Sequence, residues 1–334
     1  MKTMSHLLLI LATLANDPDR VLGPTIERSV RFVERIECKS ASGNGYLTDV
    51  EVRVAIPVDD RRQTITELRF QPRPDAFVSD GQGNRFAVYR RARVAAKEVV
   101  EVGWSCRVRL SEIAHNVNRT GLKPLSEAPE EVRAAYLGDA VKYGMTDPHM
   151  RKVAASLGGK AKDPLDLAFR INEHLRGRLT YRNDGKWESA DRVLRNGHGS
   201  CSEYNFAFIA LARLNGLPAR YVGASALRSA GPQYEDTVHH RWTEVYLPGH
   251  GWFPIDSSRN DGEDGSPVNR WFGRTSASLL VLMRGEGGKN HPLRWGYVAT
   301  VDARRIGDGR LSKRKRFLWA KVPPTKAAAS DGND

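Results

Sequence analysis

Hydrophobic and polar residues alternate with a period of two over much of the first third of the chain. The alternation is clearest in residues 50–56 and 100–110, where every second residue is apolar. This pattern is typical of antiparallel strands with one buried face. The glycine-containing segments 42–45 and 80–84 supply hairpin turns between such strands. Residues 26–118 are therefore predicted to form a β-sandwich of roughly seven strands.

The next part of the chain carries signals for helix starts. Pro129, Pro148 and Pro164 each stand at an expected first helical position, where the missing proline N–H is not needed. Asp147 and Asp163 precede the last two prolines as N-caps. These signals predict three helices of modest length.

A more apolar, alanine-rich helix is expected to begin at Cys201. Ser200 and Glu203 form a Ser-x-x-Glu capping box, which places Cys201 in the first helical turn. The unpaired N–H groups and the positive dipole end of that turn favour a thiolate over a thiol. Cys201 is therefore a candidate nucleophile. The alternative interpretation is a small, inert, buried residue.

Two segments rich in aromatic and β-branched residues follow, 238–247 and 251–256, with Pro248 and Gly249 in the turn between them. They predict an antiparallel hairpin, in which the start of the first strand lies beside the end of the second. His240 and Asp256 occupy those two places. Cys201 would then attack a substrate, His240 would carry the proton, and Asp256 would fix the tautomer of the histidine.

Other residues near these segments are alternatives for the same roles. Adjacent strand residues face opposite sides, so only one of His239 and His240 is expected to point at Cys201. Asp236 and Glu244 are alternative carboxylates, expected on a solvated loop and on a solvated strand face. A serine nucleophile at Ser200 is disfavoured, because its surroundings lack the Gly-x-Ser-x-Gly elbow.

Four short blocks in this order resemble the transglutaminase-like superfamily of cysteine enzymes, most strongly over residues 165–260. The blocks are Gly197–Cys201, Leu217–Gly223, His240–Val245 and Gly251–Asp256. The resemblance implies that Cys201, His240 and Asp256 match the catalytic residues of the family, and its His-x-Trp pattern selects His240 over His239. Arg241 stands where relatives often have alanine. On a strand it is expected to point away from its neighbours.

Pattern and resemblance together predict an α+β protein, with an antiparallel β-sandwich ahead of a transglutaminase-like, papain-like α+β core. The expected division is a signal peptide and linker, the β-sandwich, the catalytic domain, and a basic segment with a disordered tail, over residues 1–25, 26–118, 119–310 and 311–334.

The apolar run Leu7–Ala15 after Lys2 has the length of a signal-peptide core and is too short to span a membrane. Export to the periplasm or outside the cell is favoured over a cytoplasmic location, with an N-terminal amphipathic helix as the alternative. No later segment has the length and apolarity of a transmembrane helix. If the chain is exported, Cys38 and Cys106 could pair, or they could be two separate buried thiols.

Charge and cysteine content restrict the partners. The chain has 52 basic and 39 acidic residues, a net charge of +13, and a basic cluster at Lys313–Arg316. The cluster is expected on a surface strand or as a contact to an acidic component. The spread of charge does not favour specific nucleic-acid recognition. Three cysteines without paired spacing predict no metal site, and no cofactor is expected.

The predicted reaction is acyl transfer on an amide bond of a protein or peptide, through a thioester on Cys201. Bacterial relatives with a β-domain ahead of the core resemble hydrolases more often than crosslinking enzymes, so the resemblance implies a peptidase or amidase. The alternatives are a protein-glutamine gamma-glutamyltransferase, which crosslinks proteins, and a catalytically silent peptide-binding module.

Overall fold

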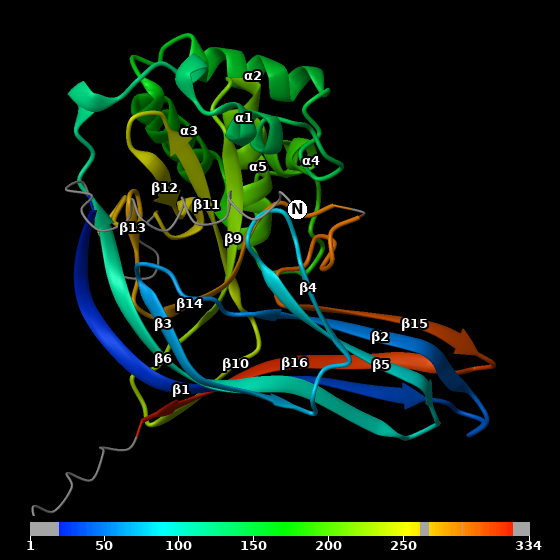
Figure 1. Ribbon diagram of the computed structural model, residues 1–334. Helices are drawn as coiled ribbons and strands as arrows, with labels where there is room; N and C mark the ends of the chain where they lie inside the picture. Colours follow the sequence, from blue (N-terminus) through cyan, green and yellow to red (C-terminus); the bar gives the residue numbers. More distant parts are fainter. Residues whose placement is uncertain (1–19, 261–266, 289, 323–334) are drawn as a thin grey trace, which may run out of the picture.

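The helices lie at one end of the protein, and the long strands run through the rest (Figure 1). The computed structural model describes residues 20–260, 267–288 and 290–322. The strands are β1 (Arg20–Lys39), β2 (Tyr46–Ile56), β3 (Gln63–Gln71), β4 (Ala76–Ser79), β5 (Arg85–Val94), β6 (Val99–His115), β7 (Thr180–Tyr181), β8 (His198–Gly199), β9 (Ala219–Ala226), β10 (Gln233–Asp236), β11 (His240–Leu247), β12 (Gly251–Ile255), β13 (Arg274–Thr275), β14 (Leu279–Gly285), β15 (Ala299–Ile306) and β16 (Arg310–Lys321).

The helical elements connect the β-rich first part to the strands around the candidate site. They are the α-helices α1 (Glu130–Tyr136), α2 (Pro148–Gly158), α3 (Pro164–Arg178), α4 (Ala190–Asn196) and α5 (Cys201–Leu214), and the 3-10 turns η1 (Arg119–Gly121), η2 (Leu125–Glu127) and η3 (Ser257–Arg259). The prolines at 148 and 164 begin α2 and α3 behind their aspartate N-caps, as the sequence predicts. Pro129 instead occupies the N-cap of α1.

The described strands form two sheets on the β-rich side, a third beside the helices, and a short parallel pair of β7 and β8. The first sheet has the order β10-β16-β1-β6-β13, with β3 also paired to β6. The second has the order β15-β2-β5-β4, and the third has the order β12-β11-β9-β14. The pairings within these three sheets are antiparallel. The predicted α+β fold with antiparallel sheets is confirmed.

The period-two residues of the first part face the core as expected. Val52 and Val54 of β2 are 2% and 0% exposed, and Trp104 and Val108 of β6 are 1% and 2% exposed. Burial of alternate side chains explains the alternation, because successive strand residues point to opposite faces of the sheet.

The last two strands return to the first two sheets. β15 pairs with β2, and β16 pairs with β1 along most of its length and with β10 at its end. The sequence division had placed residues 299–306 in the catalytic segment. In the structure they form β15, which pairs with β2. The sequence could not indicate this pairing, because the two segments are more than 200 residues apart and such contacts leave no local pattern in the chain.

Two of the expected buried thiols lie far apart on neighbouring strands. Cys106 stands opposite Val30, eight residues from Cys38 along β1, and both thiols are buried and free. Eight residues of strand span about 26 Å, while a disulfide needs Cα atoms within about 7 Å. The structure therefore corresponds to two separate buried thiols.

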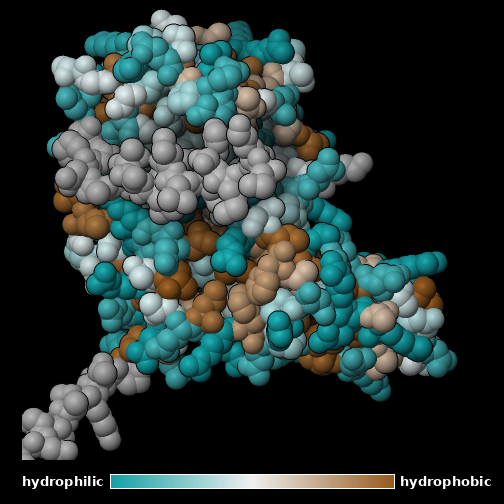
Figure 2. Space-filling view, viewed as in Figure 1, coloured by the Kyte–Doolittle hydropathy of each residue, from teal (hydrophilic) through white to brown (hydrophobic). Residues whose placement is uncertain are grey.

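Some expectations fall outside the described residues. These are the signal peptide within residues 1–19 and the disordered tail within residues 323–334. Within the described part of the chain, no helix combines the length and apolarity needed to cross a membrane. Hydrophilic residues cover much of the helical end on the face seen in Figure 2.

Candidate active site

Cys201 is the first residue of α5, a helix that is apolar on all sides and buried along almost its whole length. Such a helix belongs inside a core, where it packs here against α2, α3, α4 and the strands β9 and β11. Glu203 Oε2 accepts the backbone N–H of Ser200 at 2.7 Å, as expected from the capping pattern. The thiol of Cys201 therefore lies at the helix N-terminus, in a residue that is 6% exposed.

His240 and Asp256 meet at one end of the predicted hairpin. β11 and β12 pair with Thr243 opposite Ile255, which brings the start of β11 near the residue after β12. The Nε2 atom of His240 lies 2.5 Å from Oδ2 of Asp256, and both side chains are buried. The imidazole of His240 also interacts with the thiol of Cys201, and each group shifts the pKa of the other. The structure thus brings together the three residues selected from the sequence.

The charges of this group favour a thiolate and an imidazolium. Burial opposes ionisation of Cys201, but the hydrogen bond and positive charge of His240, together with Arg241, lower the pKa of the thiol. Burial also opposes protonation of His240, but the Asp256 carboxylate and the bonds to Asp256 and Cys201 raise the pKa of the imidazole to about 9. With Nε2 on Asp256, the other ring nitrogen, Nδ1, is left to exchange a proton with the sulfur.

The loop after β12 holds Asp256 in place through two polar contacts. Ser258 donates its hydroxyl to Asp256 Oδ1 at 2.8 Å. Asn172 of α3 accepts bonds from Ser257 and Asn260 through its Oδ1, each at 2.9 Å. Because Asn172 is fully buried, these bonds fix the loop to the helix and leave the second carboxylate oxygen of Asp256 for His240.

Asn205 connects the nucleophile helix to the histidine strand. Its Nδ2 donates to the carbonyl of Cys201 at 2.6 Å and to the carbonyl of Arg241 at 3.0 Å, and its Oδ1 accepts the Thr243 hydroxyl at 2.6 Å. This residue was not identified from the sequence, where it is an ordinary polar residue in an apolar helix. The contacts fix the distance between Cys201 and the neighbour of His240.

Arg241 is fully buried and is surrounded by aromatic rings. Its guanidinium carbon lies 4.3 Å from the ring centroid of Tyr221, 4.4 Å from that of Tyr297 and 4.9 Å from that of Trp187. Its Nη2 donates to the Trp295 carbonyl at 2.7 Å. From the sequence, Arg241 was expected only to point away from its strand neighbours. In the structure its charge also helps to lower the pKa of the Cys201 thiol.

His239 does not follow the alternation expected between neighbouring histidines. It precedes β11 with φ at +62°, so strand geometry does not apply to it, and its side chain lines the cavity of Cys201. Its Nδ1 lies 3.4 Å from Oδ2 of Asp236. The two histidines thus have different carboxylate partners, Asp236 for His239 and Asp256 for His240.

The two alternative carboxylates lie in structural contacts. Asp236 was expected on a solvated loop but is fully buried, where it accepts bonds from the Ser225 hydroxyl, the Ala226 N–H and Arg228. Asp236 is the last residue of β10 and stands opposite Phe317 of β16, and this pairing explains its burial. Glu244 forms an ion pair with Arg220 of β9 at 2.7 Å.

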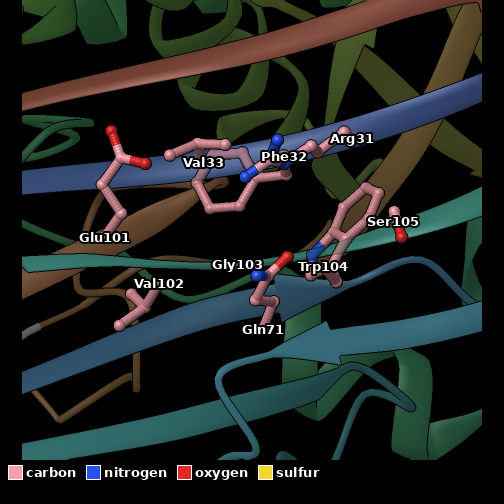
Figure 3. Close-up of a pocket in the computed structure, with 9 residues that line it drawn as sticks. All are labelled: Arg31, Phe32, Val33, Gln71, Glu101, Val102, Gly103, Trp104 and Ser105. Atoms are coloured by element: carbon pink, nitrogen blue, oxygen red, sulfur yellow. The ribbon is translucent and has the colours of Figure 1, made fainter.

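A cavity of about 110 Å³ opens beside the thiol. Its lining comes from the β7 region, the start of α5, the residues before β11 and the segment before β15, and one residue comes from β16: Tyr181, Asn183, Trp187, Ser200, Cys201, Ser202, Val238, His239, Gly296, Tyr297, Val298 and Lys315. A second cavity of about 100 Å³ lies between β1 and β6 (Figure 3). No cysteine or histidine lines it, so the cavity of Cys201 is the candidate site.

Tyr181 is the closest aromatic candidate for a role in chemistry. It lines the same cavity as Cys201. Burial and the neighbouring charge of Cys201 raise the pKa of this phenol to about 12. The hydroxyl therefore keeps its proton near neutral pH. Tyr181 was not among the candidate site residues selected from the sequence.

Metal ligation has no support in the described part of the chain. No group of three or more histidine, cysteine, aspartate or glutamate residues there has the arrangement of a metal site.

Comparison with known proteins places this core in a family. Residues 151–257 match the model of the transglutaminase-like superfamily. A protein of Haemophilus influenzae, described only as uncharacterized, is 29% identical over 161 residues, which are 39% of this chain and 42% of that protein. The match thus spans about two fifths of that relative.

One solved structure shares the fold over most of the chain. A candidate cysteine protease from Cytophaga hutchinsonii superposes with a TM-score of 0.62 over 90% of this chain and 99% of that chain, at 13% identity. The periplasmic domain of TgpA from Pseudomonas aeruginosa gives a TM-score of 0.38 over 70% of this chain and 89% of that chain, at 14% identity. The segment that matches the transglutaminase-like superfamily, residues 151–257, includes Cys201, His240 and Asp256.

Proposed function

We propose that the protein is a cysteine-dependent acyl-transfer enzyme that acts on amide bonds, with Cys201, His240 and Asp256 as its catalytic triad. The observation that carries the proposal is the 2.5 Å contact between Nε2 of His240 and Oδ2 of Asp256, with the thiol of Cys201 close enough that it and the imidazole shift each other's pKa. The match of residues 151–257 to the transglutaminase-like superfamily supports a cysteine-dependent enzyme.

In the first step the thiolate of Cys201 attacks the carbonyl carbon of the amide, and a tetrahedral intermediate forms. The backbone N–H of Cys201, at the start of α5, is the first donor that we assign to the negative oxygen. The Tyr181 hydroxyl, in the lining of the same cavity, is the second. Both groups then stabilise the oxyanion.

His240 completes the step by giving its proton to the leaving amine, so that a thioester remains on Cys201. The neutral imidazole then takes a proton from the incoming water or amine, which attacks the thioester and releases the thiolate. Asp256 holds the ring through Nε2 in both steps and stabilises the imidazolium.

We propose hydrolysis over crosslinking, so that the protein acts as a peptidase or amidase on protein or peptide substrates. The candidate cysteine protease that shares the fold over 90% of this chain is consistent with this choice. A protein-glutamine gamma-glutamyltransferase remains the second candidate, because the triad permits either water or an amine as acceptor.

Mass spectrometry of products from a mixed peptide library with a primary amine separates these reactions. A hydrolase produces cleaved or deamidated peptides in the presence of the amine, whereas a crosslinking enzyme produces amine adducts. The Cys201→Ala variant is the control. If the wild-type chain gives neither product above this control, the protein is a binding module and the proposal fails.

A further inference from the structure

We infer that the cavity beside Cys201 contains a subsite for a carboxylate group, with Lys315 of β16 as the cation that binds it. The inference deepens the proposed function, since it names a feature of the substrate for the same cavity. It gives β16 a role in substrate recognition, although β16 pairs with β1 and belongs to a different sheet from β11 and β12.

Lys315 and Cys201 line one cavity although they are 114 positions apart in the chain. The ammonium group of Lys315 donates to the carbonyl of Ala299 at 2.7 Å. An ammonium group has three N–H donors, and this bond uses one of them. The side chain is therefore anchored by its neighbour and retains donors for a ligand.

The charged residues that line the cavity are all basic. Lys315 and His239 are its basic residues, and no aspartate or glutamate is among the residues described in its lining. Hydroxyl and amide groups of Ser202 and Asn183 provide further polar contacts. A cavity with low-dielectric walls and basic groups alone attracts anions and disfavours cations.

Glu34 is the acidic neighbour of Lys315, but it compensates only part of the positive charge of the lysine. It stands directly opposite Lys315 in the ladder of β1 and β16, and it is fully buried. Neither of its carboxylate oxygens has a hydrogen-bond partner. Burial raises the pKa of Glu34 to about 7, against the positive charges of Lys315 and Lys313.

A substrate carboxylate would complete this arrangement. It could accept hydrogen bonds from Lys315 that Glu34 does not accept, and such charge-assisted bonds are stronger than neutral ones. The scissile carbonyl must lie at Cys201 at the same time, so a cavity of about 110 Å³ requires the two groups to be close in the substrate. The substrate class is therefore an amide with a carboxylate near the bond that is attacked.

Two alkylating reagents test the subsite without a known substrate. Iodoacetate and iodoacetamide both form a carbon–sulfur bond to Cys201 and release iodide, but only iodoacetate carries a carboxylate. Their rates at Cys201 are measured by mass spectrometry of the peptide that contains it. The ratio of the two rates cancels changes in thiol reactivity and leaves the contribution of charge recognition.

The Lys315→Met variant should lower the iodoacetate-to-iodoacetamide ratio roughly fivefold or more, because a positive charge a few ångströms from the reagent is removed. The matched control is Lys321→Met, an exposed lysine in the same strand, which should leave the ratio within about twofold of wild type. An unchanged ratio in Lys315→Met, or an equal fall in Lys321→Met, would overturn the inference.

Two further variants keep the test valid if Lys315→Met does not fold. Lys315→Arg keeps the charge and should keep the ratio. Glu34→Gln removes the competing carboxylate and should raise the ratio, and a fall in this variant would contradict the subsite. The ratio is also independent of the triad: if iodoacetamide reacts no faster than with an ordinary thiol, the proposed function fails, while the ratio still measures the subsite.

Discussion

The carboxylate of Asp256 accepts a hydrogen bond from Nε2 of His240 at 2.5 Å, inside a site where both side chains are buried. This contact has two consequences. It raises the pKa of the imidazole, and it assigns the other ring nitrogen to Cys201. A change at Asp256 therefore affects both the charge and the orientation of the base.

The Asp256→Asn variant should lose most amide hydrolysis while it keeps the fold. An asparagine can still hold the ring, but it cannot stabilise the imidazolium, and in a comparable triad this change lowers kcat by about 10⁴. The measurement is kcat on a peptide identified in the product screen. Retention of more than a tenth of wild-type kcat would exclude Asp256 as the orienting carboxylate.

Activity should depend on pH in a bell-shaped manner. The acid limb follows ionisation of Cys201, whose pKa lies below its ordinary value, and the alkaline limb follows loss of the His240 proton near pH 9. The measurement is kcat/KM across pH 4–11. In Asp256→Asn the alkaline midpoint should move down, because the charge that raises the pKa of His240 is absent.

The same protonation contributes to stability. The folded state holds the His240 proton more tightly than the unfolded state, whose pKa is near 6.5. This contribution is complete below pH 6.5 and is lost as the pH rises through about 9. Urea unfolding at several pH values in wild type and in Asp256→Asn measures it. An equal loss of stability in both proteins would contradict this origin.

Replacement of the buried cation Arg241 by methionine should raise the pKa of Cys201. The charge of Arg241 favours the thiolate, so its removal shifts the acid limb of iodoacetamide labelling to higher pH. Arg241→Lys is the charge-preserving control, and it should shift the limb less. If the labelling profiles of wild type and Arg241→Met coincide, the charge of Arg241 does not affect Cys201, and the residue serves only to pack among the aromatic rings.

The Tyr181→Phe variant should lower kcat by roughly 10-fold to 1,000-fold with little change in KM, as expected for loss of an oxyanion donor. Tyr234→Phe, a matched change in the partly buried β10 strand outside the cavity, should leave kcat near wild type. A rise in KM alone would give Tyr181 a role in binding and none in the transition state.

Asn205→Ala should destabilise the fold by about 2–4 kcal/mol, since three hydrogen bonds of roughly 1 kcal/mol each are lost inside the core. The exposed Asn116 provides the control, and Asn116→Ala should change stability by less than about 0.5 kcal/mol. Denaturant unfolding measures both. A loss below about 1 kcal/mol in Asn205→Ala would show that the contacts with Cys201 and Arg241 are not needed to hold α5.

Local patterns in the sequence were sufficient for much of the fold and for the selection of the triad. The alternation in β2 and β6 follows from the two faces of a strand, and the start of α5 follows from Ser200 and Glu203, which act within one turn. Cys201, His240 and Asp256 were selected because a helix start, a hairpin and the resemblance indicated them together.

Only the tertiary structure decided which distant segments complete the site. The pairing of β16 with β1 brings Lys315 to the cavity, and packing against β9 turns Arg241 into a buried cation among aromatic rings. The burial of Asp236 and the left-handed backbone of His239 also follow from packing. Burial and strand pairing depend on contacts between residues far apart in the chain, and such contacts leave no periodic signal in the local sequence.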